Sequence, residues 1–403
     1  MKNITLFYLF LVLISLPSFC QISQTETKII TSKSVIPIVY RGHIYIQGAA
    51  DSVPGNFVFD TGASNLYFDS LYYADGHFNY ENITTAKLPG AGAKPQDVIV
   101  ILDSVSFQFA DYLYKTKIVP VLQLKPILGD FSDGIIGLEY FAESIFELNY
   151  SQEYVVLHQN KKSLNLIDYH KIELEKIGNR LFLPLSVQIN PAIRIEGRFQ
   201  LDFGSGGTVT MTSSIAKKYK LEEEIEEKVA YFTKYGGVGG ESSSFEFLST
   251  AVSLGAFVFD SVVMEFSVDK SGALASNEHL GLLGNGILDR FHVLIDFMEP
   301  ALYLKSNKDY EKSFEFSRLG FGYVDRNQSM KAWIVTGLYK GSHAENSGLQ
   351  IDDQIISVNE ILVADINYRA QKDFFKNVNE VVMIVKRKGV IKQFQFQLEP
   401  VLD

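Results

Sequence analysis

The sequence predicts an all-β protein in which one folding unit occurs twice and a smaller domain follows. Three observations lead to this prediction. The 403 residues include 30 Phe and 21 Tyr, an aromatic content typical of strand-rich proteins. Short apolar alternations, separated by Gly, Asn and Asp turns, run through most of the chain. Several of these passages recur in the same order farther along, which indicates an internal duplication.

The composition is that of an ordinary globular protein of two or three domains. Hydrophobic residues make up 46% of the chain and charged residues 21%, which is enough to form sizeable cores. The formal net charge of −10 argues against nucleic-acid binding, because such proteins carry a basic surface. The single cysteine excludes a disulfide framework and a cysteine-based zinc site, and the seven histidines lack the spacing of a helical zinc site.

Residues 1–20 have the pattern of a secretory signal peptide. Lys2 gives a positive start, an apolar run covers Leu6 to Leu16, and Ser18 and Cys20 are small residues suited to cleavage after Cys20. The alternative is a lipoprotein signal in which Cys20 is kept and acylated, although Phe19 fits that pattern poorly. We therefore expect an exported protein, in the periplasm, at the cell surface or secreted, and prefer simple cleavage over a lipid anchor.

The duplication is visible in paired passages. Asn56–Ser64 and Arg198–Gly206 are both apolar alternations that run into Asp-x-Gly, and their aspartates lie 142 residues apart. Downstream, Asp133–Phe141 matches Leu280–Leu288 at an offset of 147, and two further pairs keep that offset. The predicted boundaries are residues 34–160 for the first copy, 161–180 for a polar linker and 181–307 for the second copy.

These motifs carry a family resemblance. Asp60-Thr61-Gly62-Ala63-Ser64, after three apolar residues, resembles the active-site loop of aspartic proteases of the pepsin and retropepsin type. Ile135-Ile136-Gly137 and Leu282-Leu283-Gly284 resemble the strand that crosses behind that loop in the same family. The resemblance covers roughly two thirds of the chain. It implies a two-lobed double β-barrel in which each lobe supplies one catalytic aspartate, Asp60 and Asp202.

The chemistry of such a pair explains the residue types. Two carboxylates held about 3 Å apart cannot both ionise, so they share one proton. One then acts as a base on water while the other donates to the scissile carbonyl. Gly62 and Gly204 allow the backbone to approach each carboxylate closely. A hydroxyl between Asp and Gly, as at Thr61, can form a hydrogen bond across the lobe interface.

Phe203 is the sharpest departure from the family pattern, which has Thr or Ser at that position. Phenylalanine cannot form the cross-lobe hydrogen bond and is bulky beside the pair of aspartates. Three outcomes stay open: an active enzyme with a modified loop, an inactive protein that still binds peptides, or pairing of the first loop with its equivalent in a second molecule. We expect the first, because both aspartates are kept.

The resemblance also implies a hairpin, or flap, near the site in each lobe. Leu88–Ala93, with Gly90 and Gly92, is the candidate in the first copy, although it lacks the tyrosine that the family carries at the tip. Tyr235–Gly240, with Gly237 and Gly239, is its counterpart in the second copy. The alternative is that both are plain surface turns.

Residues 318–403 resemble a PDZ domain. Leu319-Gly320-Phe321-Gly322 matches the carboxylate-binding loop, and His343–Asn359 matches the core signature, with Asp352 where glycine is usual. Asn367 is a candidate N-cap for a groove helix over Tyr368–Lys376. The resemblance implies that an extended peptide adds to an exposed strand edge while its C-terminal carboxylate meets backbone N–H groups.

Together, these features predict an exported aspartic endopeptidase in which Asp60 and Asp202 activate water. No metal or organic cofactor is expected. The expected partners are peptide or protein substrates, with a C-terminal peptide ligand at the PDZ domain and no nucleic acid. The alternative is a catalytically inactive peptide-binding protein with protease-like lobes.

Overall fold

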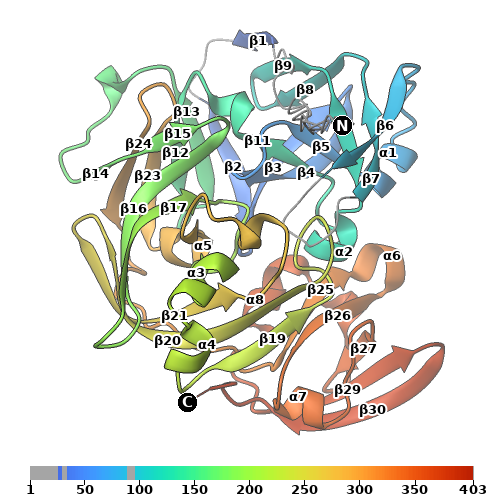
Figure 1. Ribbon diagram of the computed structural model, residues 1–403. Helices are drawn as coiled ribbons and strands as arrows, with labels where there is room; N and C mark the ends of the chain where they lie inside the picture. The colour runs from blue at the N-terminus through green and yellow to red at the C-terminus, as the bar shows by residue number, and fades with distance from the viewer. Residues whose placement is uncertain (1–25, 30–33, 89–95, 403) are drawn as a thin grey trace, which may run out of the picture.

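The computed structural model describes residues 26–29, 34–88 and 96–402. The predicted signal peptide and residues 89–93 of the first flap candidate, with Gly90 and Gly92, lie outside the described residues. Strands dominate the rest, and the lobes formed by the two copies lie side by side with the C-terminal domain against both (Figure 1). The predicted all-β class is therefore confirmed. No helix in the described part of the chain is long and apolar enough to cross a membrane.

The first sheet has 16 strands and contains the strands of lobe 1 together with three from farther along the chain. Its strands are β1 (Glu26–Ile29), β2 (Val35–Tyr40), β3 (Ile44–Ala50), β4 (Val53–Asp60), β5 (Leu66–Asp69), β6 (Ile83–Leu88), β7 (Gln96–Ile101), β8 (Val105–Phe109), β9 (Tyr112–Thr116), β10 (Val119–Leu122), β11 (Gly134–Gly137), β12 (Ile145–Asn149), β13 (Tyr154–His158), β14 (His170–Glu173), β23 (Phe291–Asp296) and β24 (Ala301–Ser306).

The second sheet has 14 strands and runs from lobe 2 into the C-terminal domain without a break, because β19 pairs with β26. Its strands are β15 (Glu175–Ile177), β16 (Arg180–Gln188), β17 (Arg194–Leu201), β18 (Val209–Met211), β19 (Val229–Thr233), β20 (Ser242–Leu254), β21 (Phe257–Ser267), β22 (Gly281–Leu283), β25 (Phe321–Arg326), β26 (Ala332–Tyr339), β27 (Gln354–Val358), β28 (Ile361–Leu362), β29 (Glu380–Arg387) and β30 (Val390–Gln397).

Helices are few and short. The α-helices are α1 (Ser70–Asp75), α2 (Lys125–Leu128), α3 (Ser213–Lys218), α4 (Leu221–Glu224), α5 (Asn285–Leu288), α6 (Asn327–Met330), α7 (His343–Asn346) and α8 (Gln371–Phe374). The 3-10 helices are η2 (Leu138–Phe141), η3 (Lys161–Ser163), η4 (Ala273–Ala275), η5 (Val363–Asp365) and η6 (Tyr368–Ala370).

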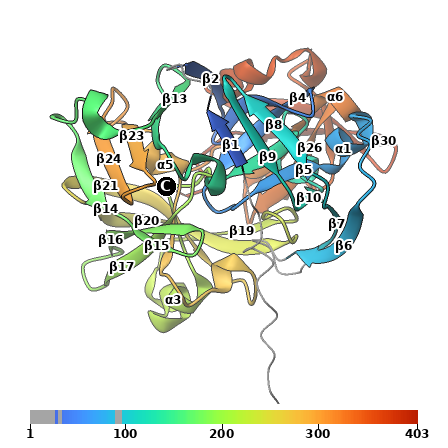
Figure 2. The same cartoon turned by 90° about the horizontal axis from the view of Figure 1, so that it is seen from above.

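The two copies meet along a pair of strands that repeat one another. β12 and β23 pair antiparallel, with Ile145 opposite Asp296 and Asn149 opposite His292. At the centre of this register Glu147 lies opposite Leu294, its own counterpart 147 residues later. The copies are therefore related by an approximate two-fold axis through this strand pair. Viewed from above, β16 and β17 of lobe 2 lie at one side of the molecule and β6 and β7 of lobe 1 at the other (Figure 2).

The segment predicted as a linker, residues 161–180, carries strands of its own. β14 pairs with β24 in the first sheet, and β15 pairs with β16 in the second. The polar composition reflects exposed strand faces, since Lys171, Glu173, Glu175 and Lys176 are all exposed. The connection between the copies is thus part of both sheets.

The described residues form four hydrophobic clusters, two large and two small. The largest buries residues from both lobes in one continuous cluster that includes Phe59, Phe146, Leu201 and Phe203. The C-terminal domain has its own core around Trp333, which is fully buried. Because the lobes share one core, the loops that carry Asp60 and Asp202 are fixed relative to each other by packing.

Candidate active site

Each candidate catalytic aspartate lies at a strand end, with a second strand running parallel behind it. Asp60 ends β4, and Gly137 of β11 lies beside it in the parallel ladder. In lobe 2, Leu283 of β22 lies beside Leu201, the residue before Asp202. A Cβ at Gly137 would approach the backbone nitrogen of Asn65 to 2.5 Å, so only glycine allows this strand to cross behind the loop.

The structure brings Asp60 and Asp202 together. Their carboxyl groups form a hydrogen bond with each other. The Gly62 N–H donates to Asp60 Oδ1 at 2.6 Å, and the Gly204 N–H donates to Asp202 Oδ1 at 2.9 Å. The two loops therefore hold their carboxylates through equivalent backbone donors, with the approximate two-fold axis between them.

Protonation of this pair is shifted in the direction that proton sharing requires. Burial raises the pKa of Asp60 above the ordinary range of an aspartate, against the hydrogen bonds from its own loop. Burial, followed by the charge of Asp60, raises the pKa of Asp202 to about 8. The pair therefore retains a proton at neutral pH, and that proton belongs to both groups together.

Thr61 forms the cross-lobe contact expected of a hydroxyl in this loop. Its side chain is fully buried and its Oγ1 donates to the Leu201 carbonyl at 2.7 Å. The same oxygen accepts a hydrogen bond from the Phe203 N–H at 3.1 Å. Thr61 of lobe 1 thus holds the backbone on both sides of Asp202.

Phe203 does not crowd the aspartates as the sequence suggested it would. Its ring is fully buried in the shared core, with its centroid 5.4 Å from that of Phe59. Phe203 therefore also reaches across to the opposite lobe, but through an apolar contact. At the end of the first loop, the Ser64 carbonyl accepts a hydrogen bond from the Glu139 N–H at 3.2 Å.

Two residues near the pair were missed by sequence reasoning. His43 lies in the turn between β2 and β3, and its ring forms a hydrogen bond with the backbone of Gly204. Burial lowers the pKa of His43 to about 4, so the imidazole is neutral at physiological pH. Asn285 opens α5 and is fully buried among backbone groups of both lobes. Neither side chain belongs to a recognisable local motif.

The flap candidate of lobe 2 is the tip between β19 and β20. Gly237 and Gly239 have φ of +125° and +114°, which non-glycine residues rarely adopt. Val238 between them packs against a hydrophobic cluster of lobe 1, so the tip crosses to the other lobe. Lys234 at its base forms an ion pair of 2.5 Å with Asp352 of the C-terminal domain.

The predicted carboxylate-binding loop leads into β25. Gly320 has a φ of +70°, and its carbonyl accepts the Ser342 hydroxyl at 3.0 Å. Phe321 is buried in the core of the C-terminal domain, and Leu319 packs against that core. Gly322 lies under Tyr231 of β19, since a Cβ there would be 2.3 Å from the tyrosine hydroxyl oxygen.

The groove helix begins where it was predicted, but it is shorter and irregular. The Asn367 side chain accepts the Arg369 N–H at 2.8 Å, as expected of an N-cap. One 3-10 turn, η6, precedes α8, which ends at Phe374 instead of Lys376. Phe374 and Phe375 turn towards Trp333 in the core, which ties the end of the helix down.

A segment of lobe 1 lies against the edge of β25 and the start of this helix. The Asp130 N–H donates to the Asp325 carbonyl at 2.7 Å. Phe131 stacks on Tyr368, with ring centroids 4.5 Å apart and planes 13° from parallel. Gln371 also donates to the Asp325 carboxylate. The strand edge at which a peptide would add is thus contacted in part by the chain itself.

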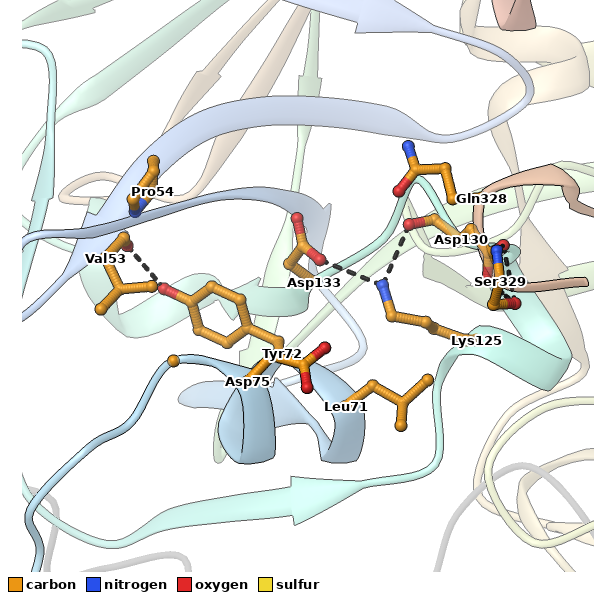
Figure 3. Close-up of a pocket in the computed structure, with 11 residues that line it drawn as sticks. Val53, Pro54, Leu71, Tyr72, Asp75, Lys125, Asp130, Asp133, Gln328 and Ser329 are labelled. Atoms are coloured by element: carbon orange, nitrogen blue, oxygen red, sulfur yellow. Dashed lines mark hydrogen bonds and ion pairs between the residues drawn. The ribbon is translucent and has the colours of Figure 1, made fainter.

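Beside this contact lies a shallow pocket of about 440 Å³ between lobe 1 and the C-terminal domain (Figure 3). Lys125 points into the cluster that forms its floor, where the Nζ donates to the carbonyls of Asp130 and Ser132 and to the Asp133 carboxylate. The lysine is 8% exposed and its donors are all used. The pocket is therefore part of the junction between lobe 1 and the C-terminal domain.

The comparisons with known proteins bear mainly on the C-terminal domain. Residues 310–386 match the family model of the PDZ domain. This part of the chain is a PDZ domain. The matched residues begin before the predicted start at 318 and stop before the last strand, β30, which ends at Gln397.

Two further similarities are more distant. A stretch of 140 residues is 29% identical to the carboxy-terminal processing protease CtpB of Bacillus subtilis, covering 33% of this chain and 29% of that protein. The chain therefore spans less than a third of this curated relative. Among solved structures, an aspartic proteinase from Irpex lacteus matches 70% of this chain and 99% of its own at 11% identity, with a TM-score of 0.43. A likeness at this level carries no argument about function.

Proposed function

We propose that this protein is an aspartic-type endopeptidase whose PDZ domain recruits peptides or protein substrates. The observation that carries the proposal is the hydrogen-bonded pair of half-buried carboxyl groups, Asp60 and Asp202, held by matching backbone donors in two equivalent loops. Such a pair retains one proton near neutral pH, the state needed for both acid and base catalysis.

In the proposed reaction, the ionised carboxylate of the pair removes a proton from a bound water as its oxygen attacks the scissile carbonyl carbon. The protonated carboxyl donates to the carbonyl oxygen, which gives a neutral tetrahedral intermediate. When the C–N bond breaks, the carboxyl that took the proton from water gives it to the leaving nitrogen. The other carboxylate takes a proton from a hydroxyl of the intermediate, which restores the singly protonated pair. The products are a new carboxyl terminus and a new amino terminus, and water is the only co-reactant.

In this proposal, the PDZ domain delivers peptides to the aspartate pair, and its contacts with both lobes support that role. Its strand β26 pairs with β19 in the hairpin of lobe 2, and β25 contacts lobe 1 through Asp130. The name of the partial relative, a carboxy-terminal processing protease, supports an association of this PDZ domain with proteolysis. Export of the chain is part of the proposal and is tested by fractionating cells that express it.

The decisive test is peptide cleavage by the purified protein over a range of about pH 3 to 8, with Asp60→Asn and Asp202→Asn as variants. Both substitutions should lower kcat/KM by about three orders of magnitude or more, because the two groups act as a unit. Asp260→Asn, a substitution at an exposed aspartate of β21, is the matched control and should leave activity unchanged.

Each alternative has its own signature in that experiment. A non-enzymatic peptide binder, favoured by Phe203 in place of a hydroxyl, would give the same background for wild type and Asp60→Asn. An enzyme assembled from the first loops of two molecules would retain activity in Asp202→Asn and lose it on dilution. The hydrogen bond between Asp60 and Asp202 within one chain supports the single-chain pair over this last alternative.

A further inference from the structure

The two copies differ at two matched positions near the aspartates. Thr61 and Phe203 each follow an aspartate, while Leu138 and Asn285 lie 147 residues apart, each directly after the crossing glycine. In lobe 1 the residue in the loop is polar and the residue behind it is apolar. In lobe 2 the loop residue is apolar and the one behind it is polar. The polar residue is thus in the loop in lobe 1 and after the crossing glycine in lobe 2.

Asn285 is fully buried, and its amide makes three hydrogen bonds. Its Nδ2 donates to the Phe203 carbonyl at 2.8 Å and to the Gly42 carbonyl at 2.9 Å. Its Oδ1 accepts from the Tyr150 hydroxyl at 2.7 Å. Because Gly42 and Tyr150 belong to lobe 1, this amide joins the loop of Asp202 to the opposite lobe.

The contacts of Asn285 complement those of Thr61. Thr61 holds the Leu201 carbonyl and the Phe203 N–H, and Asn285 holds the Phe203 carbonyl. The backbone on both sides of Asp202 is therefore fixed by polar contacts to or through lobe 1. The turn of Gly42 contributes a further contact, since the His43 ring bonds to the backbone of Gly204.

We propose that Asn285 is a positioning residue for the aspartate pair, holding the Asp202 loop where lobe 2 lacks a hydroxyl equivalent to that of Thr61. Asn285 acts through the backbone of Phe203, and this role in catalysis rests on the proposed peptidase function. A backbone displacement of about 1 Å at a catalytic group can lower the rate on the order of 100-fold. Loss of the hydrogen bond from Asn285 to the Phe203 carbonyl should therefore have a measurable effect on kcat.

The test replaces Asn285 with leucine, the residue that lobe 1 has at the matched position. Asn285→Leu should lower kcat by about 100-fold with KM changed less than about threefold, and should speed amide hydrogen exchange at Phe203 and Gly204. The double variant Asn285→Leu with Phe203→Thr has a hydroxyl after Asp202. Its kcat should be at least about tenfold higher than that of Asn285→Leu alone. Ser249→Ala removes another buried hydrogen bond of lobe 2 and serves as the control for simple destabilisation.

Several results would overturn the inference. Asn285→Leu with wild-type kcat and wild-type exchange would do so, as would an equal loss of kcat in Ser249→Ala at equal loss of stability. Absence of rescue by Phe203→Thr, with both variants folded, would also contradict it. If the wild-type protein cleaves no peptide, the peptidase proposal fails, and amide exchange alone decides: faster exchange at Phe203 and Gly204 in Asn285→Leu supports the clamp, and unchanged exchange refutes it.

Discussion

The two aspartate loops have the same backbone design but use different chemistry to grip the opposite lobe. In the first loop, Thr61 reaches into lobe 2 with a buried hydroxyl that bonds two backbone groups. In the second, Phe203 reaches into lobe 1 with a ring that packs on Phe59. The residue after each aspartate contacts the other lobe in both loops. Thr61 does so through hydrogen bonds and Phe203 through an apolar ring contact.

Substitutions at the glycines of the two loops should have the largest effects. A Cβ at Gly204 would lie 2.4 Å from the Asp60 carboxyl carbon, whereas one at Gly62 would lie 3.0 Å from Asp60 Oδ1 and 3.4 Å from Asp202 Oδ1. Gly204→Ala should therefore displace Asp60 and lower kcat by about 100-fold or more, and Gly62→Ala should cost clearly less. Steady-state kinetics on one peptide would decide, and a larger loss in Gly62→Ala would contradict the geometry.

We expect loss of the Thr61 hydroxyl to have the next largest effect. Thr61→Val leaves the Leu201 carbonyl and the Phe203 N–H buried without their partner, so stability should fall by about 2–3 kcal/mol in urea unfolding. Thr61→Ser keeps the hydroxyl and is the matched control. Phe203→Leu keeps an apolar side chain and should cost about 1 kcal/mol. Equal losses of unfolding free energy in Thr61→Val and Phe203→Leu would show that the polar and the apolar contact stabilise the protein equally.

The pH dependence of stability tests the electrostatics of the second loop. Because the pKa of Asp202 is raised to about 8, the carboxyl stays protonated in the folded state while the unfolded chain ionises above about pH 4. This group therefore makes wild type progressively less stable between about pH 4 and 8. Asp202→Asn should be more stable than wild type at pH 8, by on the order of 2 kcal/mol, and nearly equal at pH 4. A gain that is the same at both pH values would contradict the raised pKa.

A further comparison concerns how each lobe attaches the PDZ domain. Asp130 of lobe 1 is 5% exposed and accepts from Arg326 Nε at 2.6 Å and from the Ser329 N–H at 2.7 Å. Asp130→Ala should lower the free energy of unfolding by about 1–3 kcal/mol, because it leaves the partly buried Arg326 guanidinium without its carboxylate partner. Lys234→Ala breaks an exposed pair with Asp352 on the lobe 2 side and should cost less than about 1 kcal/mol. Chemical unfolding of both variants measures the difference, and a reversed order would mean that lobe 2 holds the domain.

Much of the candidate site was readable from local sequence. Asp60, Thr61, Gly62, Asp202 and Gly204 were found because each lies within a short motif that the chain carries twice. The same holds for the PDZ loop around Gly320, whose positive φ is a local property. The glycines located a hairpin tip in lobe 2, whose role as a flap stays a prediction. Its contacts with lobe 1 and the PDZ domain were not predictable.

Asn285 and His43 were missed because their roles depend on residues far away in the chain. Asn285 bonds Phe203 and Gly42, which lie 82 and 243 positions away. One signal was present: the contrast between Leu138 and Asn285 at the repeat offset marks a place where the lobes differ. What a buried amide would do there depends on which backbone groups face it.

The all-β class, the duplication, the aspartate motifs and the PDZ domain were predictable from the sequence alone, because alternation, turn residues and short motifs are set by neighbouring positions. The tertiary structure alone placed Phe203 in the core shared by the lobes and Asn285 against the Phe203 carbonyl. It also decided that β19 continues into the PDZ sheet and that Asp130 contacts β25. These contacts join groups brought together only by folding, so their pairing depends on the packing of whole lobes and not on any local pattern.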